Sequence, residues 1–230
     1  MKTELPEAGN VLVLAPHPDD EALGCGGAVA LLGRRGTVVR NVFLTNGERV
    51  YGEPSPEVSE KRIAEARLVS DTLGCSEPHF LDFPDGDVSS HIDRCLKPVG
   101  DLIDRYRPDI VFAPSPLDYH EDHLAASRIA LRLMREKPGF LLVFYEVYST
   151  IRFTHLIDVT EVIELKKTAI SQYKVSLYGK PDLYIDAALG VNTQRSIFLQ
   201  RRGYYEAFWL LESPITDAEA ARWLTFGLSA

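Results

Sequence analysis

The run Val11-Leu12-Val13-Leu14-Ala15, followed by Pro16-His17-Pro18-Asp19-Asp20-Glu21, decides the fold and the chemistry of this chain. Five apolar residues predict a short buried strand, and the turn that follows holds an imidazole beside two adjacent carboxylates. Adjacent carboxylates raise each other's pKa unless a cation neutralises them. We therefore expect a divalent metal at the end of this strand.

A second cluster, His120-Glu121-Asp122-His123, supplies the ligand that one turn cannot provide. A catalytic zinc usually takes three protein ligands and keeps one position open for water. His17 and His123 can reach one ion if the fold brings their loops together. The remaining histidines stand alone in the sequence and are expected to be hydrogen-bonded or solvated: His79, His91 and His155.

The composition is that of an ordinary globular protein, with 45% hydrophobic and 25% charged residues in a chain of 230. The formal net charge of −8 argues against nucleic-acid binding, which needs clustered Lys and Arg. Three cysteines, none in a C-x-x-C pair, favour neither a disulfide framework nor a cysteine zinc site. Because no apolar run has the length of a signal peptide core or a membrane span, we expect a soluble, cytoplasmic protein without a transmembrane segment. The sequence does not decide whether the protein forms a homo-oligomer.

Short apolar runs alternate with helical patterns up to about residue 150, which is typical of βαβ units around a parallel sheet. Strands are predicted at 11–15, 38–45, 78–81, 109–113 and 140–148. Helices are predicted at 22–35, 56–73, 92–106, after 123, at 161–173 and at 191–201. We expect a single α/β domain over residues 1–230, a Rossmann-like three-layer fold with a mostly parallel central sheet, whose C-terminal third closes over the active site.

A polar motif follows each of the first four predicted strands. These motifs are the His17 turn and residues 45–48, 83–87 and 116–120. In a parallel sheet such loops gather at the carboxyl ends of the strands, where open α/β sheets bind ligands. The coincidence of four loops predicts one site at that edge.

With these motifs the chain resembles the PIG-L/LmbE-like family of zinc-dependent N-acetylglucosaminyl deacetylases. The most specific part of the resemblance is Ala15 to Glu21 followed by Gly24-Cys25-Gly26-Gly27. Supporting stretches are residues 45–48, 62–65, 83–86, 120–123 and 158–160. The family's second histidine motif commonly reads His-Pro-Asp-His, and Glu121 replaces that proline here.

The resemblance implies a Rossmann-like fold and a zinc ion held by His17, Asp20 and His123, with Fe²⁺ as the alternative metal. It leaves Asp19 free beside the metal. Asp19 is expected to act as the general base that takes a proton from zinc-activated water during attack on an amide carbonyl. We assign no role to Tyr119.

The resemblance also implies roles for residues around the metal. His120 is expected to stabilise the tetrahedral oxyanion, and Asp122 to orient His120 or to support a metal ligand. Arg62 and Asp85 match the positions that hold the sugar. The alternatives are an exposed helix pair of Arg62 with Glu65, and a Pro-Asp-Gly turn role for Asp85.

We therefore expect a metal-dependent hydrolase that removes an N-acetyl group from an N-acetylglucosaminyl conjugate, a small-molecule partner. An amidase acting on another N-acyl substrate is the nearest alternative. Two histidines and one carboxylate are also the iron ligands of non-haem Fe(II) oxygenases, although those enzymes place the ligands on an all-β jelly roll. A non-catalytic nucleotide-binding module would use Gly24 to Gly27 as a phosphate turn, but the G-x-G-x-x-G spacing is missing. For these glycines we favour close helix–sheet packing.

Overall fold

The computed structural model describes residues 2–215 and 219. The strands are β1 (Asn10–Ala15), β2 (Val38–Thr45), β3 (Ser76–Phe83), β4 (Ile110–Pro114), β5 (Leu141–Tyr145), β6 (His155–Asp158) and β7 (Tyr205–Leu211). The α-helices are α1 (Asp20–Arg34), α2 (Pro56–Leu73), α3 (Ile92–Tyr106), α4 (Glu121–Glu136), α5 (Ile163–Gln172) and α6 (Pro181–Arg195).

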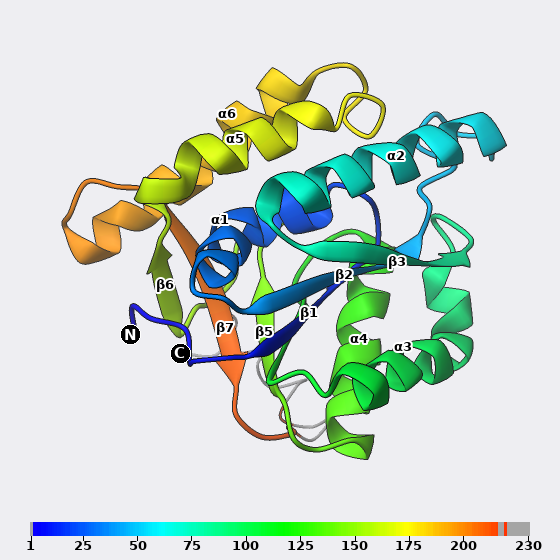
Figure 1. Cartoon of the computed structure of the whole chain (residues 1–230), viewed down its shortest axis with the longest axis horizontal. Helices are drawn as coiled ribbons and strands as arrows, with labels where there is room; N and C mark the ends of the chain where they lie inside the picture. Colours follow the sequence, from blue (N-terminus) through cyan, green and yellow to red (C-terminus); the bar gives the residue numbers. More distant parts are fainter. Residues whose placement is uncertain (1, 216–218, 220–230) are drawn as a thin grey trace.

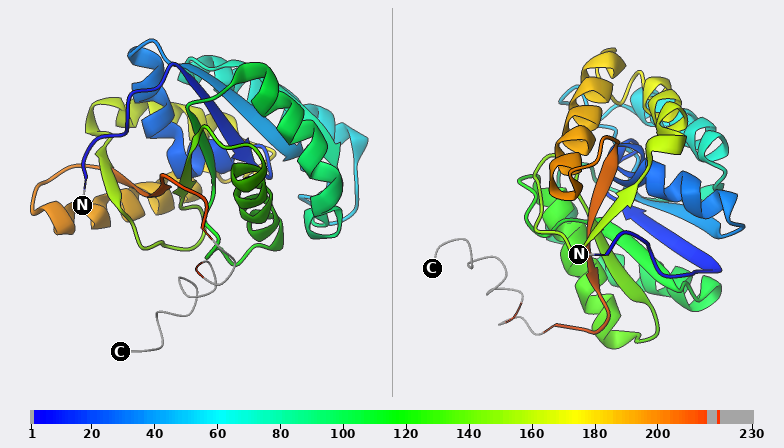
Figure 2. Two further views of the ribbon diagram at one scale, coloured as in Figure 1. Left: turned by 90° about the horizontal axis from the view of Figure 1, so that it is seen from below. Right: turned by 90° about the vertical axis from the view of Figure 1, so that its left-hand side faces the viewer.

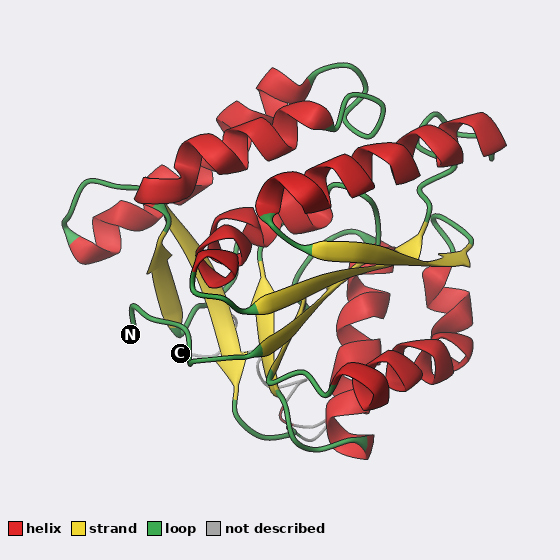
Figure 3. Cartoon of the chain, viewed as in Figure 1, coloured by secondary structure: helices red, strands yellow, loops and turns green. Residues whose placement is uncertain are grey.

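The described strands form one seven-stranded sheet in the order β3-β2-β1-β4-β5-β7-β6. Strands β1 to β5 pair in parallel, whereas β7 runs antiparallel to both β5 and β6. Helices α1, α2, α5 and α6 lie on one face of the sheet, and α3 and α4 lie on the other (Figures 1 and 3). This arrangement confirms the predicted three-layer α/β fold with a mostly parallel sheet.

The strand order determines where the site lies. The chain passes from β1 outward to β2 and β3, then returns to place β4 on the other side of β1. The loops after β1 and β4 therefore lie next to each other and lead to helices on opposite faces. Such a topological switch point is where open α/β sheets bind ligands. The His17 turn follows β1, and His120 immediately precedes α4.

Local signals at both ends of α2 explain its bounds. The Ser55 hydroxyl accepts a hydrogen bond from the Val58 N–H at 3.3 Å, and Pro56 occupies the first helical position. Gly74 ends the helix in the left-handed region, with φ of 74°. These ends set the register that places Arg62 on the buried face of α2.

Glycines allow α1 to pack closely against the sheet and the segment after β6. A Cβ atom on Gly24 would overlap the Tyr145 ring, and one on Gly27 would lie 2.7 Å from Val159 Cβ. The predicted close packing is therefore confirmed. Because these glycines lie inside a helix and not in a phosphate-binding turn, the structure contradicts the nucleotide-binding alternative.

A buried ion pair anchors α1 to β7. The Glu206 carboxylate accepts hydrogen bonds from the Gly27 and Ala28 N–H groups at 2.8 and 2.7 Å. Lys166 of α5 lies 2.6 Å from the same carboxylate, and both charged side chains are fully buried. Removing one partner of such a pair leaves an uncompensated buried charge. The pair thus holds in place the helix that begins at Asp20.

One predicted helix is misplaced. The helix expected at 191–201 spans Pro181–Arg195 instead, and begins at a proline. Proline fits the first turn of a helix, where its missing N–H has no intrahelical partner. The sequence pattern in this region is weak because the helix is only partly buried along its length.

Two features of the β-structure also differ from the prediction. The strand expected at 140–148 ends at Tyr145, opposite the last residue of β4, Pro114. Residues 146–148 therefore turn away from the sheet toward the site. β6 and β7 both lie outside the predicted strands. The four residues of β6 are too few to show a clear alternation of apolar and polar positions.

The last third of the described chain covers the α1 and α2 side of the sheet, with α5 against both helices (Figure 1). The N-terminal segment lies beside β6, where Lys2 and His155 form a bridge (Figure 2). No described helix is long and apolar enough to cross a membrane. Residues 1, 216–218 and 220–230 of the predicted domain lie outside the described residues, and its closure over the active site stays a prediction.

Replacing Gly27 by alanine is expected to lower the free energy of unfolding by about 1–3 kcal/mol, because the new methyl group overlaps Val159. Gly26→Ala is the matched control, since its Cβ would meet only ordinary contacts at 3.7 Å and alanine favours a helix. Urea unfolding of both variants measures the difference. Equal stability of the two variants would contradict the close packing at Gly27.

Candidate functional site

The loops that follow the parallel strands meet at the carboxyl edge of the sheet. The Thr45 hydroxyl donates to the Pro16 carbonyl at 3.0 Å, which joins the loops after β2 and β1. The Asp85 N–H donates to Glu48 Oε1 at 2.9 Å, and the Gly86 N–H donates to Asp122 Oδ2 at 2.8 Å. All four predicted loops therefore belong to one cluster.

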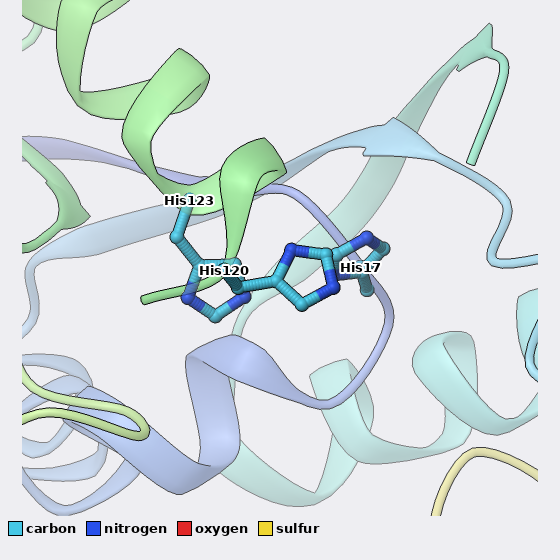
Figure 4. Close-up of side chains that lie close together, drawn as sticks. All are labelled: His17, His120 and His123. Carbon is cyan, nitrogen blue, oxygen red and sulfur yellow. The ribbon is translucent and has the colours of Figure 1, made fainter. Parts of the chain in front are cut away.

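Asp20 lies between the two histidines predicted as metal ligands. Its Oδ2 atom is 3.2 Å from His17 Nδ1, and its Oδ1 atom is 3.2 Å from His123 Nε2. All three side chains are buried. Figure 4 shows His17 in the loop before α1 facing His120 and His123 at the start of α4. The fold thus brings the predicted ligands together.

In the row formed by His17, Asp20 and His123, three buried atoms lack hydrogen-bond partners among the described residues: Asp20 Oδ1, His123 Nδ1 and His123 Nε2. Asp20 Oδ1 and His123 Nε2 are both buried and unsatisfied, although they lie within 3.2 Å of each other. Buried polar atoms are rarely left unpaired, because their desolvation is costly. Imidazole nitrogen and carboxylate oxygen are ligands that suit Zn²⁺ or Fe²⁺. Among the described residues, ligand atoms converge within 4.8 Å of one another in two sets that could hold a divalent metal ion: His17 with His120 and His123, and His17 with Asp85 and Asp122.

The outer nitrogens of both histidines face carboxylates. His17 Nε2 lies 3.0 Å from Asp122 Oδ2 and 3.1 Å from Asp85 Oδ1, and His123 Nδ1 lies 3.3 Å from Asp118 Oδ2. Carboxylates in this position fix the orientation of metal-binding imidazoles and raise their basicity. Asp118 carries no recognisable motif in the sequence, and its one signal is its place in the loop after the fourth predicted strand.

The pKa values of the row reflect this concentration of negative charge. Burial lowers the pKa of His123, but Asp20 and Asp118 outweigh burial and raise it to about 9. Burial likewise opposes protonation of His17, whose pKa is nevertheless held well above its usual value by Asp122, Asp20 and Asp85. The carboxylates favour positive charge at this position, which a divalent cation also supplies.

Asp19 occupies a strained backbone conformation, with φ of 138°. Its N–H donates to Glu21 Oε2 at 3.2 Å, and the Tyr173 hydroxyl donates to Glu21 Oε1 at 2.5 Å. The Asp19 carboxylate pairs with Arg62 Nη2 at 3.2 Å. Burial raises the pKa of Asp19, and the Arg62 charge acts in the opposite direction. These contacts fix the Asp19 carboxylate beside His17 and Asp20.

Arg62 is 3% exposed and contacts the backbone of the turn that carries His17 and Asp19. It donates to the carbonyls of Pro18 at 2.7 Å and Gly47 at 3.0 Å, and to the Ser176 hydroxyl at 3.0 Å. Glu65 accepts hydrogen bonds from the Ser176 N–H and hydroxyl at 3.2 and 3.0 Å. The alternative of an exposed Arg62–Glu65 pair is therefore wrong. Substrate binding by Arg62 stays a prediction.

His120 stands beside the row with a defined tautomer. Its Nδ1 atom accepts the Asp122 N–H at 3.2 Å, so the neutral ring carries its proton on Nε2. The ring centroid lies 4.9 Å from those of both His17 and His123. The Asp122 carboxylate is fixed by the Val88 N–H at 2.9 Å and faces His17. The site thus contains a hydrogen-bond donor next to the metal-binding atoms.

The three remaining histidines lie outside this site. His79 Nε2 is hydrogen-bonded to the Tyr106 hydroxyl at 3.0 Å, and His155 Nδ1 to the Thr154 hydroxyl at 2.8 Å. His91 lies 3.7 Å from Asp87. The hydrogen bonds expected for isolated histidines are confirmed for His79 and His155.

Known proteins are similar to this chain in sequence and in fold. Residues 12–134 match the family PIG-L, described as GlcNAc-PI de-N-acetylase. A diacetylchitobiose deacetylase from Thermococcus kodakarensis is 30% identical over 184 residues, which cover 71% of this chain and 68% of that protein. The conserved protein TT1542 from Thermus thermophilus has a TM-score of 0.72 and 31% identity, covering 90% of this chain and 96% of that one.

Another protein shares the fold alone. The 4-carboxy-2-hydroxymuconate hydratase GalB from Pseudomonas putida KT2440 has a TM-score of 0.70 at 23% identity, covering 90% of this chain and 98% of that one. Its name describes a hydration. The architecture by itself therefore does not specify an amide hydrolase, and activity depends on the side chains of the site.

Replacing Asp118 by alanine is expected to weaken zinc binding by about 10–100-fold, because His123 loses the carboxylate behind its outer nitrogen. Competition with a chromogenic chelator measures the zinc affinity. Asp186→Ala, which removes an exposed carboxylate from α6, is the control and should bind zinc as the parent does. Unchanged affinity in a folded Asp118→Ala protein would exclude this supporting role.

Proposed function

The chain belongs to the PIG-L family of de-N-acetylases, and we propose that it is a metal-dependent hydrolase that removes the N-acetyl group from an N-acetylglucosaminyl conjugate. The observation that carries the proposal is the buried row of His17, Asp20 and His123 with Asp19 beside it. We name these three residues as the metal ligands. Zinc is the proposed metal, and Fe²⁺ is the alternative.

Asp19 performs the proton transfers in this proposal. When bound, zinc supplies a Lewis acid that lowers the pKa of water and polarises the amide carbonyl. The Asp19 carboxylate accepts the proton of the water molecule as the water oxygen attacks the carbonyl carbon. It then returns that proton to the amide nitrogen as the C–N bond breaks, which yields the free amine and acetic acid, and the acid ionises to acetate on release. Arg62 orients the carboxylate through their contact at 3.2 Å.

His120 stabilises the charge that develops on the carbonyl oxygen. Its Nε2–H is free to donate, because Nδ1 is occupied by the Asp122 N–H. Asp122 acts indirectly, by holding His17 with its carboxylate and His120 with its backbone. Asp85, which is 8% exposed beside His17, is proposed to hold a sugar hydroxyl together with Arg62.

The alternatives differ in chemistry and can be separated by experiment. An amidase would release a different acyl group from the same kind of site. A non-haem Fe(II) oxygenase would consume oxygen, and the α/β architecture argues against the jelly roll expected for that class. A cytoplasmic location and a homo-oligomer stay predictions, and no nucleic-acid partner is proposed.

Amine release from a panel of N-acetylglucosaminyl conjugates tests the proposal, with zinc-loaded and chelated protein compared. Asp19→Asn is expected to bind zinc as the parent does and to lose roughly 10²–10⁴-fold in kcat, because it no longer accepts the proton. Asp87→Asn, which changes an exposed loop residue, is the control. Undiminished turnover by the metal-loaded Asp19→Asn protein would remove Asp19 as the base.

Replacing His120 by alanine is expected to lower kcat by roughly 10²–10³-fold with zinc retained, since the oxyanion loses its donor. Steady-state kinetics and metal analysis are made on the same preparation. His91→Ala is the control because His91 lies outside the site. A kcat equal to that of the parent would exclude His120 from the chemical step.

A further inference from the structure

A cavity of about 390 Å³ adjoins the candidate active site. It lies between the first turns of α1, the segment after β5, and α6. Aliphatic side chains make up much of its lining: Leu23, Val147, Leu183, Ala187, Ala188 and Val191. The volume is within the range of small-molecule binding sites, which are mostly apolar.

Two polar side chains of the cavity wall, Glu146 and Asn192, are already engaged within the protein. Glu146 pairs with Arg195 and accepts the Ile151 N–H at 3.2 Å. Asn192 accepts a hydrogen bond from Lys166 at 3.2 Å and donates to the Tyr205 carbonyl at 3.2 Å. The wall therefore offers apolar contact more than hydrogen bonds or charge.

One tyrosine connects the cavity with the site. The Tyr148 ring stacks on that of His123, with centroids 5.4 Å apart and planes inclined by 25°. The same tyrosine lines the cavity, together with Tyr184 of α6. Because Tyr148 contacts both the histidine cluster and the cavity, the cavity lies next to a molecule bound at that cluster.

The mouth of the cavity also carries exposed apolar side chains. Leu183, which lines the cavity, is 62% exposed. Tyr119 lies outside the lining, is 72% exposed, and has its ring centroid 5.6 Å from that of the lining residue Tyr148. Exposed apolar groups around a concave site are typical of ligand-binding surfaces. An acetyl group contributes a single methyl to such a surface, so the acyl group does not account for the size of the cavity.

We propose that this cavity binds an alkyl or aryl aglycone of the amino sugar whose N-acetyl group is removed at the histidine cluster. This inference rests on the proposed function for the placement of the sugar. It predicts a substrate class distinct from conjugates with small, charged or highly hydroxylated aglycones, which would leave the apolar wall in contact with water.

Deacetylation of phenyl, octyl and methyl N-acetylglucosaminides by the zinc-loaded chain tests the proposal. The phenyl and octyl glycosides are expected to show kcat/KM at least about tenfold above that of the methyl glycoside, mainly through KM. In Ala188→Phe, which fills the cavity, this ratio should fall toward one. Asp186→Phe, on the exposed face of α6, is the matched control and should keep the parent's ratio. Circular dichroism confirms that both variants fold.

The outcomes separate the cavity from the proposed function. Equal kcat/KM for the three glycosides, or a stronger gain from lengthening the N-acyl chain of the methyl glycoside, overturns the aglycone assignment and leaves the hydrolase intact. If no glycoside is hydrolysed, calorimetric titration with the phenyl and methyl glycosides measures whether the cavity binds the aglycone. Tighter binding of the phenyl glycoside that is lost in Ala188→Phe supports the cavity, and equal binding overturns it.

Discussion

Five aspartate carboxylates are buried together at the carboxyl edge of the sheet, and balancing their charge is the constraint on which this structure depends: Asp19, Asp20, Asp85, Asp118 and Asp122. Buried charges are costly unless they are paired and hydrogen-bonded. Arg62 balances one of them, and backbone N–H groups and two imidazoles contact the others. A divalent cation in the row of His17, Asp20 and His123 would complete the balance, which is consistent with the proposed metal-assisted hydrolysis.

The strained conformation of Asp19 requires support from elements outside the turn. Glu21 and Tyr173 hold its backbone, and Arg62 holds its carboxylate and the adjoining Pro18 carbonyl. Backbone strain of this kind persists only where the surroundings determine it strongly, and it concentrates at functional sites. Helix α2 and the segment after α5 thus contribute to the geometry of the proposed base without touching the reacting atoms.

The architecture serves more than one chemistry, since a hydratase has the same fold. The difference must come from the side chains and loops at the sheet edge. In this chain, α6 and the segment after β5 form an apolar wall, and Tyr148 in that wall stacks on His123. Both segments are among those whose sequence patterns were misassigned, because partly exposed helices and strand ends carry weak periodicity.

The sequence by itself determined the strand, turn and helix around His17, the parallel sheet, and which histidines and carboxylates gather at its edge. Those features follow from local apolar periodicity, helix caps and the rule that loops after parallel strands share an edge. Only the tertiary structure decided which atoms meet, such as Asp118 with His123, Tyr173 with Glu21, and Arg62 with the turn rather than with solvent. These contacts join segments that are distant in sequence, and side-chain packing, which has no local period, selects their partners.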